Sequence, residues 1–181
     1  NAVSVAEHTL ALMLALARAV PQANQSIKEG RWEKKQFLGR ELRQKTLGII
    51  GLGRIGVEVA KRARALEMRV LAHDPYVTPV VAAEANAELV RRDQLLAESD
   101  YISLHVSLTP ETAGMINVAA LAKMKPGVRL INCARGELVD EAALAEAIGS
   151  GRVAGAALDV FAQEPPTAAN PLAGLPQVIA T

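Results

Sequence analysis

The stretch Thr46-Leu-Gly-Ile-Ile-Gly-Leu-Gly-Arg-Ile-Gly56 decides the fold. Its first half is a continuous apolar run of the length typical of a buried strand, and the pattern after it predicts a helix over residues 54–66. Three glycines at the junction, Gly51, Gly53 and Gly56, match G-x-G-x-x-G. Alone that pattern is weak, but a strand before it and a helix after it form the context in which it binds a dinucleotide.

Each glycine of the pattern has a separate predicted role. Gly51 permits the tight turn, Gly53 lets the backbone approach a pyrophosphate, and Gly56 lets helix and strand pack closely. The N–H groups and positive dipole of the helix N-terminus favour the phosphates. Asp74 ends the next predicted strand, where its carboxylate can accept hydrogen bonds from ribose hydroxyls and would repel a 2′-phosphate. The sequence therefore predicts NAD rather than NADP; a glycine-rich turn beside a surface aspartate is the less favoured alternative.

Short apolar runs alternate with helical patterns along the rest of the chain. Strands are predicted at residues 46–51, 69–73, 87–90, 101–106, 128–132, 153–160 and 177–181. Helices are predicted at residues 54–66, 78–86, 92–98, 118–124 and 140–148. This alternation is typical of βαβ units, and right-handed crossovers then give an α/β fold, a doubly wound parallel sheet of the Rossmann type.

A further helix is predicted at residues 5–20, with Ser4 as its N-cap and Glu7 at the capping-box spacing. Apolar residues nearly encircle this helix, so we expect it to be buried against a partner as well as against its own domain. Pro21 should permit at most one more turn. Residues 22–45 are predicted to form a short helix and a connecting loop.

Composition excludes several classes of protein. The chain has 181 residues, with 20 Lys and Arg against 19 Asp and Glu, so it lacks the basic surplus of a nucleic-acid binder. Its single cysteine, Cys133, cannot form an internal disulfide, which favours the reducing cytoplasm. The most apolar stretch, residues 10–20, contains Arg18 and is too short to span a membrane. No metal site is predicted.

Two more polar groups follow predicted strands, at the edge of the sheet where ligands bind. Arg135, in Asn132-Cys-Ala-Arg-Gly136, could grip a carboxylate and polarise a neighbouring carbonyl, or equally form a surface ion pair. Glu164, after Leu158-Asp-Val-Phe161, could partner a histidine and raise its pKa, although such a glutamate is more often a solvated loop residue.

The remaining histidines and the cysteine have less specific interpretations. His105 also lies at the end of a predicted strand, where lining a cofactor pocket or capping the strand is favoured over proton transfer. For His8 and His73 a packing or surface role is favoured. Cys133 is predicted to be a small buried residue whose backbone faces the cofactor, rather than a reactive thiol.

Together these motifs resemble the D-2-hydroxyacid dehydrogenase family over the whole chain. The motifs are Ser4-Val-Ala-Glu-His-Thr-Leu-Ala-Leu12, the glycine pattern, Asn132-Cys-Ala-Arg-Gly136, Val139-Asp-Glu141, Leu158-Asp-Val-Phe161 and Glu164-Pro-Pro166. Within the family the chain is most similar to the phosphoglycerate dehydrogenases. That narrower likeness rests on residues 30–42, on Asp74-Pro-Tyr-Val-Thr-Pro79 and on the cysteine before Ala134.

The resemblance implies a role for each matching residue. Arg135 would bind the substrate carboxylate and orient the carbonyl, and Glu164 would support a catalytic histidine. Asp74 would bind the adenosine ribose. Arg54 and Ile55 would meet the pyrophosphate, Cys133, Ala134 and Asp159 would line the nicotinamide side, and Val106 would lie on the adenine side. Val106-Ser107 departs there from the Thr-Pro or Val-Pro common in the family.

The resemblance also implies a parent enzyme. The chain begins at Asn1 and ends after a strand-like run, so we expect the cofactor domain of a two-domain protein. Residues 1–20 would form a linking and dimerisation helix and residues 46–181 the core. The substrate domain and a Pro-His pair just past Thr181 would lie outside it, so the chain alone should bind NAD without turnover.

The implied reaction is oxidation of D-3-phosphoglycerate to 3-phosphooxypyruvate in serine synthesis, by a homodimer that takes a small 2-hydroxy acid. Alternatives are a glyoxylate, hydroxypyruvate or D-lactate type of dehydrogenase, or an NAD-sensing corepressor.

Overall fold

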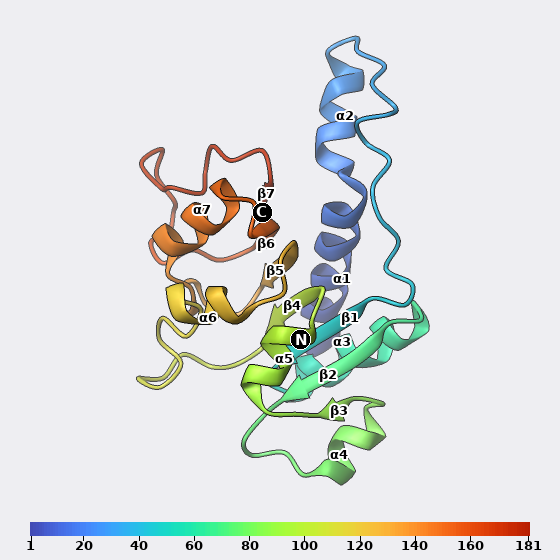
Figure 1. Cartoon of the computed structure of the whole chain (residues 1–181), viewed down its shortest axis with the longest axis vertical. Helices are drawn as coiled ribbons and strands as arrows, with labels where there is room; N and C mark the ends of the chain where they lie inside the picture. Colours follow the sequence, from blue (N-terminus) through green and yellow to red (C-terminus); the bar gives the residue numbers. More distant parts are fainter.

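The computed structural model describes residues 1–181, and a seven-stranded parallel sheet forms its centre (Figure 1). The strand order is β3-β2-β1-β4-β5-β6-β7, so the order reverses between β1 and β4. The strands are β1 Thr46–Ile50, β2 Arg69–His73, β3 Glu88–Leu89, β4 Tyr101–Leu104, β5 Val128–Asn132, β6 Val153–Leu158 and β7 Val178–Ala180. This topology confirms the predicted doubly wound fold, in which ligands bind where the strand order reverses.

Helices cover both faces of the sheet. They are α1 Ala2–Arg18, α2 Val20–Lys28, α3 Arg54–Ala65, α4 Pro79–Glu84, α5 Arg92–Glu98, α6 Val118–Lys123 and α7 Glu141–Gly149, with a 3₁₀ turn at Gly136–Leu138. Alternate strand residues point to opposite faces: Leu130 belongs to the core that also contains residues of α5, α6 and α7, whereas Ile131 belongs to the core that contains residues of α1, α3 and α4. Two aliphatic cores result, one on each face, and together they fix the orientation of the sheet.

The N-terminal helix differs from its predicted start. Helix α1 begins at Ala2 with Asn1 as its N-cap residue, so the prediction of Ser4 as the cap is wrong. Ser4 lies within the helix and its hydroxyl donates to Oδ1 of Asn1 at 2.9 Å. The capping-box spacing failed because Asn1, which is also a preferred N-cap residue type, stands three positions earlier and the helix begins directly after it.

The end of α1 also differs. The helix stops at Arg18, Ala19 takes a left-handed conformation at φ 50°, and α2 continues for nine residues from Val20. Pro21 stands in the first turn of α2, where its missing N–H would have no helical partner in any case. The expectation that Pro21 would allow only one more turn is therefore wrong, because the proline starts a new helix.

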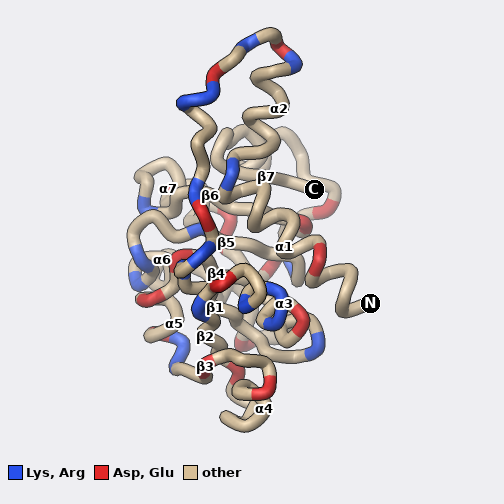
Figure 2. Tube along the Cα trace, turned by 90° about the vertical axis from the view of Figure 1, so that its right-hand side faces the viewer, with Lys and Arg blue, Asp and Glu red and all other residues tan.

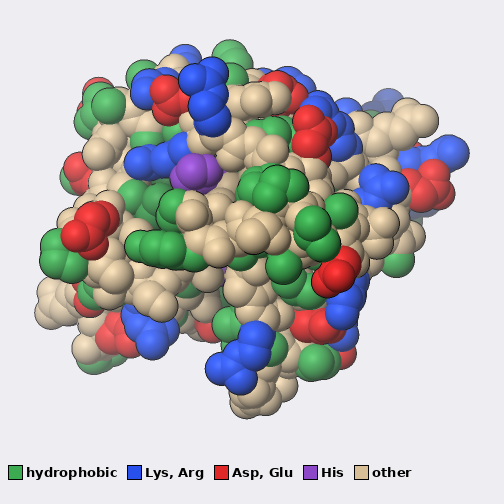
Figure 3. Space-filling model, turned by 90° about the horizontal axis from the view of Figure 1, so that it is seen from below, with side chains coloured by type: hydrophobic (Ala, Val, Ile, Leu, Met, Phe, Trp, Pro, Cys, Tyr) green, Lys and Arg blue, Asp and Glu red, His purple; other side chains and the backbone are tan.

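Residues 18–40, which we call the arm, project beyond the sheet (Figure 1). The arm closes at its base, where the amide of Arg40 donates to the carbonyl of Ala17 at 2.8 Å. Lys and Arg alternate with Asp and Glu around its tip (Figure 2). Its exposed apolar side chains are Val20, Ile27, Trp32 and Leu38. The face that points away from the arm carries apolar side chains among charges of both signs (Figure 3).

None of the helices is by itself long and apolar enough to cross a membrane; α1 and α2 pass that test only as a pair, which is bent by 62°.

Most other boundaries agree with the sequence. Strands β2 and β5 and helix α5 have the predicted limits. Strand β4 ends at Leu104 and β6 at Leu158, each two residues early. His105 and Asp159 therefore lie in loops at the carboxyl edge. Strand β5 ends as predicted, because the side chain of Asn132 accepts from the amide of Ala134 and donates to the carbonyl of Arg135, which turns the chain out of the sheet.

Candidate active site

The loop between β1 and α3 needs two of its three glycines for the fold alone. Gly51 has φ 95°, and a Cβ there would lie 2.6 Å from the carbonyl oxygen of His105. A Cβ on Gly56 would lie 2.2 Å from the carbonyl oxygen of Gly51. A Cβ on Gly53 would meet no atom within 4 Å. The backbone of Gly53 thus faces open space with no side chain in between, so a ligand can approach it closely.

The first turn of α3 has no side-chain cap, because its N-cap residue is Gly53. Its amide groups and the helix dipole therefore face the carboxyl edge, an arrangement that suits a pyrophosphate. Arg54 and Ile55 form this turn, as the sequence predicted.

Asp74 holds the glycine loop in place. Its Oδ2 accepts from the amide of Leu52 at 2.9 Å, and its Oδ1 accepts from the amide of Tyr76 at 2.9 Å. The carboxylate thus links the end of β2 to the loop after β1, a bracing role that the sequence did not reveal. Both oxygens retain lone pairs, so the ribose contact predicted for Asp74 stays compatible with this geometry.

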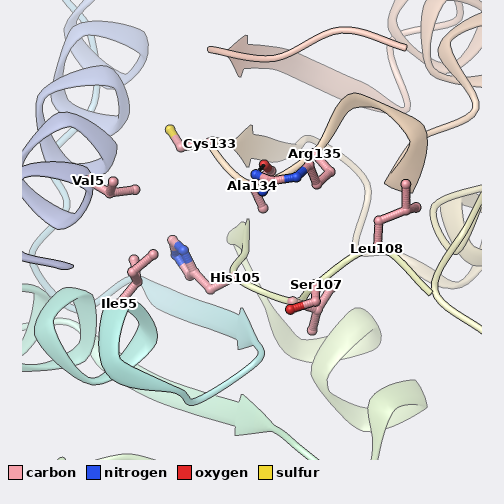
Figure 4. A pocket seen from close by; sticks show the side chains of 9 residues that line it. Val5, Ile55, His105, Ser107, Leu108, Cys133, Ala134 and Arg135 are labelled. Atoms are coloured by element: carbon pink, nitrogen blue, oxygen red, sulfur yellow. Dashed lines mark hydrogen bonds between the residues drawn. The ribbon is translucent and has the colours of Figure 1, made fainter. Parts of the chain in front are cut away.

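A cavity of about 400 Å³ opens at the reversal of strand order, and we call it the switch-point cavity (Figure 4). Its walls come from α1, the start of α3 and the loops after β4 and β5. The lining residues are Val5, Ile55, His105, Val106, Ser107, Leu108, Cys133, Ala134 and Arg135. The structure therefore brings together six residues that the sequence singled out, from three separate segments: Ile55, His105, Val106, Cys133, Ala134 and Arg135.

His105 lies in the wall of this cavity. Its Nε2 is 2.8 Å from Oγ of Ser103, and its Nδ1 is buried without a hydrogen-bond partner. Burial lowers the pKa of His105 to about 4, so the imidazole is neutral at physiological pH. An unpaired polar atom at a cavity wall is costly, and it fits a site that receives a polar ligand. His73, by contrast, donates from Nδ1 to the carbonyl of Val90 at 3.1 Å, a structural contact.

Cys133 has the environment of an unreactive thiol. Burial raises the pKa of Cys133 to about 11, and the neighbouring Thr9 side chain opposes that shift only in part. The thiol is therefore protonated near neutrality and a poor nucleophile.

Arg135 forms no ion pair. Its Nη1 donates to the carbonyl of Ala134 at 2.6 Å, and no carboxylate lies within ion-pair distance of the guanidinium. The surface ion pair that the sequence left open is thus not present. The other N–H groups of this exposed side chain are free for a substrate carboxylate.

Glu164 and Asp159 line a second cavity, of about 500 Å³, that we call the β6–β7 cavity. The amide of Phe161 donates to Oε1 of Glu164 at 3.2 Å. Arg135 and Glu164 therefore lie in neighbouring cavities rather than in one. Gly136 brings the two loops into backbone contact, since a Cβ there would lie 1.9 Å from the carbonyl carbon of Phe161.

One polar residue of this edge was missed from the sequence. His8 of α1 contacts Asp159 with its Nε2 at 3.2 Å from Oδ1. The two residues are 151 positions apart, and no local pattern connects them.

The family model for "D-isomer specific 2-hydroxyacid dehydrogenase, NAD binding domain" matches residues 10–181. The chain belongs to this family of NAD-binding domains, and NAD is its cofactor. The glycine loop, the bare Gly53 and the uncapped helix α3 fit that group.

Particular relatives narrow the class. The chain is 57% identical over all its 181 residues to a D-3-phosphoglycerate dehydrogenase of Archaeoglobus fulgidus, and it covers 34% of that protein. It thus spans about a third of the length of this curated relative. Two solved structures superpose closely. A glyoxylate reductase from Paecilomyes thermophila has a TM-score of 0.91 at 40% identity, with 99% of this chain and 55% of that one covered. A D-lactate dehydrogenase from Aquifex aeolicus, in complex with NAD and lactic acid, has a TM-score of 0.90 at 38% identity, with 100% and 59% covered.

The three glycines give a matched pair of substitutions. Gly56→Ala should lower the free energy of unfolding by about 1–3 kcal/mol, because the new methyl group meets the carbonyl of Gly51. Gly53→Ala should leave the Tm within about 2 °C and weaken NAD binding about tenfold or more, since the methyl group projects where the ligand approaches. Thermal unfolding and calorimetric titration with NAD measure both effects. A Gly53→Ala chain that binds NAD like the wild type would contradict the assignment.

Proposed function

We propose that this chain is the cofactor domain of a two-domain enzyme that oxidises D-3-phosphoglycerate to 3-phosphooxypyruvate, a reaction that supplies serine synthesis. The observation that carries the proposal is Arg135, whose guanidinium lines the switch-point cavity without a carboxylate partner. The 57% identity to the Archaeoglobus fulgidus protein supports the choice of substrate. The proposal also places the protein in the reducing cytoplasm, with Cys133 as a free thiol.

Different residues at the carboxyl edge would bind different parts of the cofactor. Gly51, Gly53 and Gly56 with Arg54 and Ile55 would hold the pyrophosphate, Asp74 the adenosine ribose, Val106 the adenine side, and Cys133, Ala134 and Asp159 the nicotinamide side. NAD supplies a hydride acceptor when it is bound. The chain's part is to place that acceptor beside the switch-point cavity and to keep the substrate in register with it.

Arg135 acts on the substrate. Its planar guanidinium can bind the carboxylate of a 2-hydroxy acid through two parallel N–H bonds, which orients the carbon that loses hydride. The same positive charge stabilises the partial negative charge on the hydroxyl oxygen as this oxygen becomes the carbonyl oxygen. Glu164, with only Oε1 engaged by the amide of Phe161, has Oε2 available to hydrogen-bond a histidine that takes the hydroxyl proton.

The substrate assignment is tested on the full-length protein. We expect reduction of NAD, followed at 340 nm, with D-3-phosphoglycerate and at least about a hundredfold lower kcat/KM with D-glycerate or D-lactate. Arg135→Lys should lower kcat/KM by about a hundredfold, because an ammonium cannot form the two-point contact. Arg91→Lys, at the exposed residue that precedes α5 and makes no side-chain hydrogen bond, is the control. Preference for glyoxylate with NADH would favour a glyoxylate reductase, in line with the structural likeness to that enzyme.

The cofactor choice is tested through Asp74 in the 181-residue chain. NADH should bind about tenfold or more tightly than NADPH, because the carboxylate repels a 2′-phosphate. Asp74→Asn should bring the two affinities within about threefold while its amide oxygen still accepts from Leu52. Asp74→Ala should also narrow the ratio, but with weaker NADH binding because the loop loses its brace. Asp93→Asn, a surface change beside Lys123, is the control. If the ratio of NADH to NADPH affinity is unchanged in both Asp74 variants, the assignment of Asp74 to the adenosine ribose is wrong.

We also propose a homodimer that forms through α1 and the arm. Leu14 on α1 is 41% exposed, and Trp32 and Leu38 on the arm are more than 70% exposed. A Trp buried at the centre of an interface is among the side chains that contribute most to binding, and burial of the two leucines adds hydrophobic stabilisation. Sedimentation equilibrium should give twice the 19.1 kDa mass of the chain, and Leu14→Glu should give the monomer mass. Val118→Glu, an equally polar change on exposed α6, should leave the dimer intact. A monomeric wild-type chain would refute the proposal.

A further inference from the structure

Three side chains from distant parts of the chain meet at the carboxyl ends of β6 and β7. Nε2 of His8 lies 3.2 Å from Oδ1 of Asp159 and 3.1 Å from Oγ1 of Thr181, and the Thr181 hydroxyl donates to the same Oδ1 at 2.8 Å. A carboxylate only accepts, and the hydroxyl hydrogen of Thr181 is already used. Nε2 of His8 must therefore carry a proton and act as the donor in this cluster.

The cluster leaves Asp159 with one fixed oxygen and one free oxygen. Oδ1 accepts from both His8 and Thr181, whereas Oδ2 has no hydrogen-bond partner. The side chain of Asp159 is 39% exposed and lines the β6–β7 cavity together with Thr181. Two donors on one oxygen hold the plane of the carboxylate, so Oδ2 is presented in a set direction. Such outer contacts are a common means of orienting a residue that binds a ligand directly.

Helix α1 connects this cluster to the switch-point cavity. His8 contacts Asp159, and Val5, three residues earlier on the same helix, lines that cavity together with Cys133. One turn of α1 thus reaches both loops that the proposed function places on the nicotinamide side.

We propose that His8 is a positioning residue for the nicotinamide end of NAD. It holds Oδ1 of Asp159, with Thr181, so that Oδ2 stands ready to accept a hydrogen bond from an amide N–H donor, and the carboxamide is such a donor at that end of the cofactor. The inference rests on the proposed function, which assigns Asp159 to the nicotinamide side. His8 itself touches neither substrate nor cofactor.

The test uses the 181-residue chain and two ligands, NAD and ADP-ribose, which lacks the nicotinamide. His8→Leu removes the donor, whereas His8→Gln keeps an N–H donor at a similar reach. Thr181→Val removes the second donor without changing the shape of the side chain. Glu7→Gln is the matched control, because Glu7 is exposed on the same helix and makes only a 3.8 Å ion pair with Arg62. Calorimetric titration gives both affinities, and the Tm verifies folding.

His8→Leu should weaken NAD about tenfold and ADP-ribose less than about twofold, and His8→Gln should recover most of the loss. Thr181→Val should also lower the affinity for NAD relative to the affinity for ADP-ribose. Glu7→Gln should leave this ratio of affinities unchanged. Equal loss of both ligands would assign His8 a purely structural role and overturn the inference, as would wild-type affinity for NAD in His8→Leu. If His8→Leu does not fold, the Thr181→Val ratio decides. A wild-type chain that binds neither ligand would instead refute the proposed function.

Discussion

Between Gly51 and Gly56 the backbone passes so close to itself that a methyl group on Gly56 would lie 2.2 Å from the carbonyl oxygen of Gly51. Only glycine permits this approach, and it lets α3 begin directly above the end of β1. Because β1 lies beside the reversal of strand order, the uncapped helix terminus faces the switch-point cavity. Asp74 then braces the loop from the neighbouring strand. The positions of the other residues at the carboxyl edge depend on this close approach of Gly51 and Gly56.

Much of the fold follows from local sequence, because strand and helix periodicity are properties of a few consecutive residues. Strands β2 and β5 and helix α5 have the predicted limits for that reason. Two N-terminal predictions failed where several local rules compete. Ser4 has a good capping pattern, but Asn1 stands three residues earlier at the position where the helix starts. Pro21 ends one helix in principle, yet it is equally suited to begin the next.

The site was harder to predict, since its geometry depends on contacts between distant segments. Each of the motifs that contain Arg135 and Glu164 can be recognised in the sequence by itself. That the two side chains line different cavities depends on the close backbone contact between Gly136 and Phe161. The bracing role of Asp74 is a hydrogen bond across 22 positions. The contact of His8 with Asp159 bridges 151 positions, so no window of sequence contains it. The types of residue in the site could be predicted from the sequence, whereas their hydrogen-bond partners could be identified only in the folded chain.

Helix α1 precedes in sequence every strand that it covers. Its apolar face packs against α3, β5 and β6, and His8 finds partners 151 and 173 positions later. During synthesis on the ribosome, this helix therefore emerges well before the surfaces that bury it. Its apolar side chains stay uncovered until β6 has been made, and uncovered apolar surface of this kind is open to aggregation in a nascent protein.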